Sequence, residues 1–151
     1  MDFREGVYNK MVSWLVYALL SALFAALTAI LAKIGIKNVD SNLATAIRTV
    51  VILLFAWAIV LSQGTFKQIP SISQFSLVFL VLSGIATGLS WLFYFKALQL
   101  GNASQVAPIA KLSLVLTVFL AILILREKVT ISIVIGAILM SVGAILVAIG
   151  K

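Results

Sequence analysis

An apolar run over residues 104–125 is long enough to cross a lipid bilayer as one helix, which takes about 20 mostly apolar residues. Pro108 and Lys111 lie well inside this run. Proline has no backbone N–H to donate, and its ring crowds the carbonyl four residues earlier, here that of Ser104. Lys111 follows Pro108 by three positions, so the cation shares a helix face with the disturbed turn. The sequence therefore predicts a broken, charged helix inside a membrane.

Two interpretations of Lys111 follow from its depth. It lies roughly 10 Å from the expected helix start at 1.5 Å per residue, so its stem can reach towards the headgroups or bond to a neighbouring helix. Alternatively it lines a cavity, because a lysine at a helix centre costs about 2.5–3.5 kcal/mol and normally faces a protein interior or water. A second cation inside an apolar run, Arg48, favours the cavity.

The composition agrees with a membrane location. The 151 residues are 64% hydrophobic and only 10% charged, whereas soluble domains carry about 25% charged residues. The net charge is +7, but the cations are scattered along the chain without a basic run, so we expect no nucleic-acid partner. The chain has no Cys and no His, which excludes disulfides, thiolate chemistry and the usual zinc or haem ligands. We therefore expect neither a metal site nor a cofactor.

The expected fold is an all-α integral membrane protein with five transmembrane helices. Residues 1–11 are polar and are expected in water or at the interface, ahead of a single transmembrane domain over residues 12–151. Asp40 or Ser41 is placed to cap the second helix. The expected spans are residues 12–32, 43–62, 77–95, 104–125 and 131–149.

Three of these helices carry weakly polar faces. Tyr17 begins such a stripe in the first helix, and Ser113 shares a face with Thr117 in the fourth. The third helix has the most polar face, with Trp91 beside it; its members are Ser83, Thr87, Ser90 and Tyr94. Helix packing and substrate contact explain these stripes equally well.

The charges outside the spans are nearly balanced between the two sides. Five spans place the termini on opposite sides, which we call A for the side of the N-terminus and B for the other. The cations on side A are Arg4, Lys10, Lys67, Arg126 and Lys128, and those on side B are Lys33, Lys37, Lys96 and Lys151. Positive residues normally mark the cytoplasmic side. Five against four gives little bias, which predicts insertion in both orientations.

Several segments together resemble the EamA family of the drug/metabolite transporter superfamily. They are WLVYALLSALFAALTAILAKIG, DSNLATAIRT, ATGLSWLFYFKALQLG, VAPIAKLS and LREKVTISIVIGAILMSVGAILV. The resemblance covers residues 11–151. Most members carry two five-helix units of inverted orientation in one chain, so this chain looks like one half-unit. The resemblance implies a multi-pass protein of a bacterial or archaeal cytoplasmic membrane that pairs with an inverted copy of itself.

The chain departs from the family pattern at three positions. Ala110 stands where an acid is expected before the lysine of the fourth helix, Asn102 replaces an acid, and Arg126 replaces a glycine before Glu127. No acid lies between Glu5 and Asp40, so the first-helix glutamate of the related small multidrug resistance proteins has no counterpart. These losses argue against proton coupling through a carboxylate.

The leading hypothesis is a secondary transporter of a small metabolite or drug-like solute, acting as an antiparallel homodimer by alternating access. The two cations inside spans, without an acid beside them, suggest an anionic or carboxylate-bearing solute. The alternative is a non-transporting membrane subunit that packs with a different membrane protein. An enzyme is not expected, because every acid lies outside the spans and no general base is available. The candidate substrate-binding residues are Arg48, Lys111, Trp91, Tyr94, Tyr17, Thr87, Ser90 and Ser113.

Overall fold

Five long apolar helices form the molecule, and they confirm the all-α membrane fold predicted from the sequence. The computed structural model describes residues 3–150, with side chains from Trp14 onward. Of the polar segment predicted over residues 1–11, residues 1–2 and the side chains lie outside this description, and the backbone from Phe3 onward belongs to the first helix. The helices are α1 (Phe3–Gly35), α2 (Ser41–Ser62), η1 (Thr65–Ser71), α3 (Gln74–Leu100), α4 (Ala103–Ala110), α5 (Ser113–Ile124) and α6 (Ile131–Ile149).

Local sequence signals account for the helix boundaries. Asp40 caps α2, since its Oδ1 accepts hydrogen bonds from the backbone N–H groups of Asn42 (2.9 Å) and Leu43 (3.1 Å). After α2 the chain turns at Gly64, whose φ of 69° lies in the left-handed region that glycine tolerates best. Ser73 caps α3 by accepting a bond from the N–H of Ser76 at 3.0 Å.

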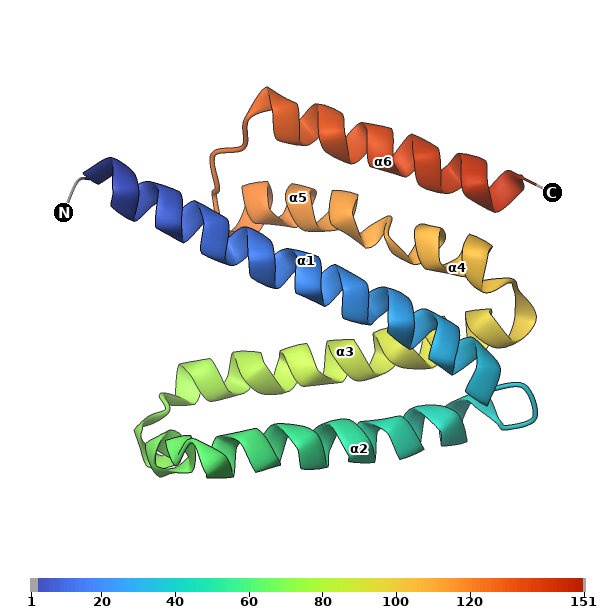
Figure 1. Ribbon diagram of the computed structural model, residues 1–151, viewed down its shortest axis with the longest axis horizontal. Helices are drawn as coiled ribbons and strands as arrows, with labels where there is room; N and C mark the ends of the chain where they lie inside the picture. Colours follow the sequence, from blue (N-terminus) through green and yellow to red (C-terminus); the bar gives the residue numbers. More distant parts are fainter. Residues whose placement is uncertain (1–2, 151) are drawn as a thin grey trace.

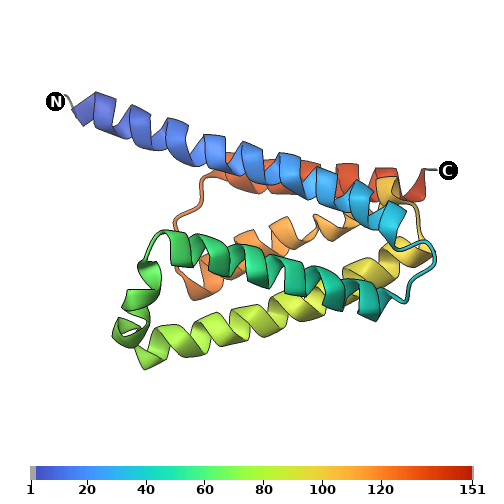
Figure 2. The same ribbon diagram turned by 60° about the horizontal axis from the view of Figure 1, so that its bottom comes forward.

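The helices form two adjacent pairs with α1 lying diagonally across them (Figure 1). In one pair α2 lies beside α3, and in the other α6 lies beside α4 and α5. α1 contacts both α3 and α4. The α1–α2 turn, the α3–α4 turn and the C-terminus share one end of the molecule, the B end. The opposite A end holds the N-terminus, η1 and the α5–α6 connection (Figures 1 and 2).

Close packing is confined to the B end. A core cluster of Ala32, Ile36, Phe95 and Leu98 joins α1 and the turn after it to the last turns of α3. The other buried residues among the described side chains are Ala29, Ser41, Thr45 and Ala144, and they lie in the same half of the helices. The large apolar side chains elsewhere face outward, as lipid-facing residues do. The subunit is therefore packed at one end and open at the other.

Candidate functional site

The fourth span is interrupted in the middle. α4 ends at Ala110, and α5 begins at Ser113 after a turn over Lys111 and Leu112. In this turn the Lys111 N–H donates to the Pro108 carbonyl and the Leu112 N–H to the Ile109 carbonyl, both at 3.0 Å. These bonds span three residues instead of four, so the helix tightens into a 3₁₀ turn and then resumes. The break predicted from Pro108 is present, and Lys111 lies at the break itself.

A cavity of about 550 Å³ lies between α1, α3 and this broken helix; we call it the central cavity. Lys111 and Ser113 line it from the break, and Ser90, Trp91 and Tyr94 line it from α3. The wall contributed by α1 consists of small residues, namely Ala22, Ala25, Ala26, Thr28 and Ala29. Small side chains on this face leave the space that the cavity occupies.

Arg48 lies behind the aromatic wall of this cavity. Its guanidinium carbon is 4.2 Å from the ring centre of Trp91 and 4.4 Å from that of Phe95. The two rings are themselves stacked, with centres 6.0 Å apart. Aromatic faces attract a desolvated cation, but Nη1 of Arg48 is buried and has no hydrogen-bond partner. Asp40 uses its carboxylate to cap α2. Arg48 is therefore held by its contacts with the two rings, and its Nη1 group remains without a hydrogen-bond acceptor.

The surroundings of Arg48 and of Lys111 share lining residues. Arg48 lines a groove of about 380 Å³ between α1 and α2, together with apolar residues such as Leu31 and Ile47. Thr28 lines both this groove and the central cavity. Trp91 lines the central cavity and contacts Arg48 with its ring. Thr28 and Trp91 thus border both the surroundings of Arg48 and the cavity that contains Lys111.

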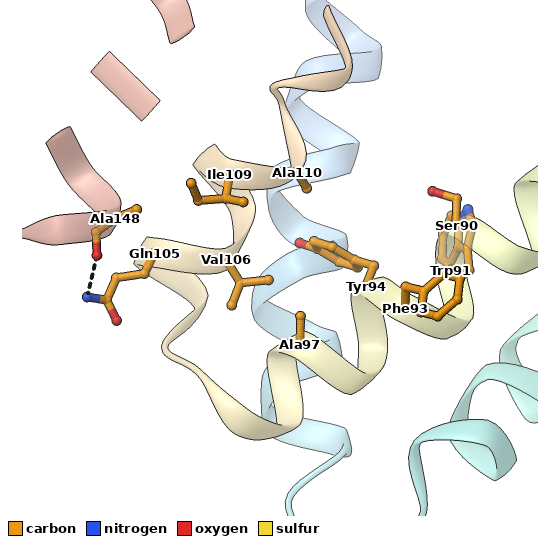
Figure 3. A pocket seen from close by; sticks show the side chains of 10 residues that line it. All are labelled: Ser90, Trp91, Phe93, Tyr94, Ala97, Gln105, Val106, Ile109, Ala110 and Ala148. Atoms are coloured by element: carbon orange, nitrogen blue, oxygen red, sulfur yellow. Dashed lines mark hydrogen bonds between the residues drawn. The ribbon is translucent and has the colours of Figure 1, made fainter. Parts of the chain in front are cut away.

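Tyr94 lies between the central cavity and a further, open cavity of about 500 Å³, which is lined by α3, α4 and Ala148 of α6 (Figure 3). Figure 3 shows its ring reaching from α3 towards Ala110 of α4. Ser90 and Trp91 line both cavities as well. At the B end of the further cavity, Gln105 Nε2 donates to the carbonyl oxygens of Gly150 (3.1 Å) and Ala148 (3.4 Å).

The structure brings most of the predicted site residues together. The central cavity contains Lys111, Trp91, Tyr94, Ser90 and Ser113, and Arg48 lies against its aromatic wall. Two predicted residues lie outside these cavities. Tyr17 is 73% exposed on α1, and the Thr87 hydroxyl donates to the Ser83 carbonyl of its own helix at 2.8 Å. These two side chains are placed for contact with lipid or with another subunit.

Thr28 and the alanine face of α1 were not among the predicted site residues. A sequence signal exists, because Ala22, Ala25, Ala26 and Ala29 follow offsets of three, four and seven, which is one face of a helix. Such a face also indicates close helix packing. Only the arrangement of α1 against the broken helix shows that here the small residues border a cavity instead.

The chemistry of the central cavity suits an anion with an apolar body. Its described lining offers an ammonium group, hydroxyl groups and aromatic surface, and it contains no carboxylate. Each of the two cations lies in a span whose described residues include no acid. Among residues 3–150 there is also no group of three His, Cys, Asp or Glu that could hold a metal ion. A ligand carboxylate or phosphate would complement this charge.

Comparison with known proteins supplies the relatives of this chain. The profile of the EamA-like transporter family matches residues 12–149. A protein of Sinorhizobium sp., described as an uncharacterized transporter in the cobO 3′ region, is 47% identical over 137 residues; the match covers 91% of this chain and 97% of that protein. An uncharacterized protein of Methanocaldococcus jannaschii is 31% identical over 107 residues, covering 65% of this chain and 78% of that protein. No solved structure matches the chain significantly.

Proposed function

Since the chain belongs to the EamA-like transporter family, a family of membrane transporters and not of enzymes, we propose that it carries a small organic anion across the cytoplasmic membrane as an antiparallel homodimer. The observation that carries this proposal is the central cavity, in which Lys111 stands at a break in a membrane-spanning helix. Broken helices near the membrane centre are a common means of building solute sites in secondary transporters.

Lys111 is the residue that binds the anionic group in this proposal. It is exposed at the cavity wall, where Ser90 and Ser113 add hydroxyl groups. Arg48 adds positive potential from behind Trp91, and the ring of Trp91 gives the apolar body of the solute a surface to pack on. Tyr94 contributes a second ring and a hydroxyl group. A carboxylate beside an aromatic or aliphatic body fits these features.

The loose packing of the subunit supports the presence of a second copy. Its accessible surface is 12,322 Å², whereas a compact folded chain of 16.2 kDa exposes roughly 7,500 Å². The difference is about 5,000 Å² per subunit, and lipid and a partner can share it, since obligate interfaces bury roughly 2,000–5,000 Å² counted over both partners. Each membrane-spanning unit of this family usually has an inverted partner. The match to the Sinorhizobium relative covers 97% of that protein, so a single five-helix unit is not peculiar to this chain.

The inverted arrangement is favoured over a parallel one by the packing of the subunit. Because the subunit is packed at the B end and open at the A end, an inverted copy sets a packed end beside each open end. A parallel copy would leave both open ends on one side of the membrane. The near balance of cations on the two sides permits insertion in both directions.

The proposal is tested by uptake into liposomes that contain the purified protein. The solutes are pairs of one shape and different charge, such as benzoate and benzamide. Measured above the uptake into liposomes without protein, we expect uptake of the anion and little or none of the amide. Lys111→Gln should lower the affinity for the anion about 10- to 100-fold, because it removes a charge-assisted hydrogen bond, and Lys111→Arg should retain most of it.

The matched control is Lys67→Gln, which removes an exposed cation of η1 far from the cavity. It should leave affinity and uptake unchanged. A well-folded Lys111→Gln protein with undiminished uptake would remove Lys111 from the site. A stable complex with a different membrane protein, without uptake of any solute, would favour a non-transporting subunit and contradict the proposal as a whole.

A further inference from the structure

The hydrogen bonds between elements show a pronounced asymmetry. Among the side chains of residues 14–150, those that bond to the backbone of a distant element do so at the B end. Lys33 Nζ donates to the carbonyl oxygens of Leu98 (2.6 Å) and Gly101 (2.7 Å). Gln99 Nε2 donates to the carbonyl of Val39 at 2.7 Å. The remaining side-chain hydrogen bonds, apart from those of Gln105 to the end of α6, join residues at most five positions apart.

Lys33 holds together elements that surround the central cavity. It stands in the last turn of α1, and its two acceptors belong to the end of α3 and to the turn that leads into α4. Carbonyl groups in the last turn of a helix have no partner within the helix, so the ammonium group satisfies acceptors that would otherwise face solvent. We call Lys33 with the carbonyls of Leu98 and Gly101 the latch.

The latch covers an apolar plug. Going from the central cavity towards the B end, the next turn of α1 adds Ala32 after Ala29, and the next turn of α3 adds Phe95 after Trp91. Ile36 and Leu98 complete the plug with exposed fractions of 2% and 0%. No comparable cluster of buried residues lies at the A end of the described side chains. The cavity is therefore closed towards side B.

We propose that Lys33 is the gate residue of the B end: its two hydrogen bonds keep this end closed, and their release lets α1 separate from α3 and α4 so that the cavity opens to side B. The inference rests on the proposed transport function, since a transporter must at some stage open at each end. Lys33 is suited to the role because its long side chain lies at the end of its span, where water can solvate both the ammonium group and the freed carbonyls. The apolar plug then separates with the helices that carry it.

A static helix cap is the competing explanation, and distance measurements between spin labels separate the two. The chain has no Cys, so Asn38→Cys and Ser104→Cys place one label on the α1–α2 turn and one on α4, both at exposed positions. Labelled protein is diluted with unlabelled protein, so that the distances within one subunit are measured.

The gate predicts that Lys33→Met raises the population of a longer distance about tenfold or more, the change expected when charge-assisted hydrogen bonds are lost. Lys33→Arg keeps donors at this position and should resemble the parent. The matched control is Lys37→Met, which removes an exposed cation four residues further along the chain and should also resemble the parent. If the distance distribution of Lys33→Met is identical to that of the parent, the proposal that Lys33 is the gate residue is wrong.

A cross-link tests whether the end must open during transport. In the pair Asn38→Cys with Ser104→Cys, whose positions are both exposed, a thiol cross-linker joins the α1–α2 turn to α4. The gate predicts that the linked protein still binds the anion but transports none, while the same variant without the linker transports. Equal transport by the linked and unlinked protein would contradict the gate proposal without contradicting the proposed transport function. If no form transports any solute, the proposed function fails, and the spin-label distances still decide whether Lys33 holds the end closed.

Discussion

Three of the four cations within the described spans have different surroundings. Lys33 donates to two backbone carbonyls, Arg48 lies against two aromatic rings, and Lys111 lines the central cavity. A charged hydrogen bond contributes about 1.5–3 kcal/mol, and a cation on an aromatic face about 0.5–2 kcal/mol. Conformations that interchange in function also differ by a few kcal/mol. Lys33 therefore binds strongly enough to hold one end closed and weakly enough to release it.

Phe95 should be among the residues most important for stability, because its side chain is 1% exposed at the centre of the B-end cluster. We expect Phe95→Ala to destabilise the subunit by on the order of 2–4 kcal/mol, somewhat less than in a soluble core, because lipid solvates apolar groups as well as protein does. The measurement is thermal unfolding in detergent. Phe93→Ala is the control, since Phe93 lies two residues earlier on the same helix and is 74% exposed. Equal destabilisation by both would show that burial in the subunit does not set the stability.

At the residue scale, the sequence indicated which side chains line the cavity better than it indicated which groups they bond to. Lys111 at the helix break and Trp91 and Tyr94 on α3 all line the central cavity. Lys33 was expected to be an ordinary loop cation, and its acceptors 65 and 68 positions away cannot be found from local patterns. At Arg126 the family pattern has a glycine, and the φ of 54° explains why: left-handed backbone costs a residue with a side chain about 1–2 kcal/mol.

At the scale of elements, the break between α4 and α5 determines where the site lies. Pro108 lacks the N–H that would bond to Ser104, and the bonds of Lys111 and Leu112 span three residues. The sequence predicted this disturbance because it follows from the covalent structure of proline. The cavity beside the break could not be predicted in the same way, since it depends on how α1 crosses α3 and α4 (Figure 1).

Replacing the proline should separate stability from function. Pro108→Ala restores the missing N–H and removes the steric conflict, and proline within a helix costs about 3 kcal/mol relative to alanine. We expect a protein that unfolds at a higher temperature but binds the anion more weakly, because a continuous helix would turn Lys111 away from the cavity. Thermal unfolding and ligand titration on the same preparation test this. Ser104→Ala, at an exposed position of the same helix outside the lining of the central cavity, is the control and should change neither value much. A Pro108→Ala protein with unchanged affinity would show that the break is not needed for binding.

The predicted spans also contain no carboxylate that could carry a proton. The four acids are Asp2, Glu5, Asp40 and Glu127, and none lies in a predicted span. Coupling to protons normally uses a carboxylate within the membrane. We therefore expect facilitated diffusion or exchange, with uptake into liposomes little changed by an imposed pH gradient. A steep dependence that persists in Asp40→Asn and Glu127→Gln would contradict this expectation and point to Lys111 as the proton carrier.

At the scale of the whole molecule, the subunit is packed at one end and open at the other. The described buried side chains lie in the B half, and the contacts of Lys33, Gln99 and Gln105 lie at the B end itself. The number of spans and their order were predictable, because each apolar run is long enough to cross the bilayer. Uneven packing was not, because nearly uniform apolar helices carry no pattern that says which half will be buried.

The central claim is that transport needs two copies in opposite orientations, and fixing the orientation tests it most directly. One variant adds cations to the A end through Gln68→Lys and Ser71→Lys, and the other adds them to the B end through Asn38→Lys and Ser104→Lys. Added positive charge should hold the loaded side in the cytoplasm, which a reporter fused after Lys151 verifies. We predict that each variant alone transports little and that the two produced together restore uptake. Full uptake by either variant alone, in a single verified orientation, would contradict the antiparallel homodimer.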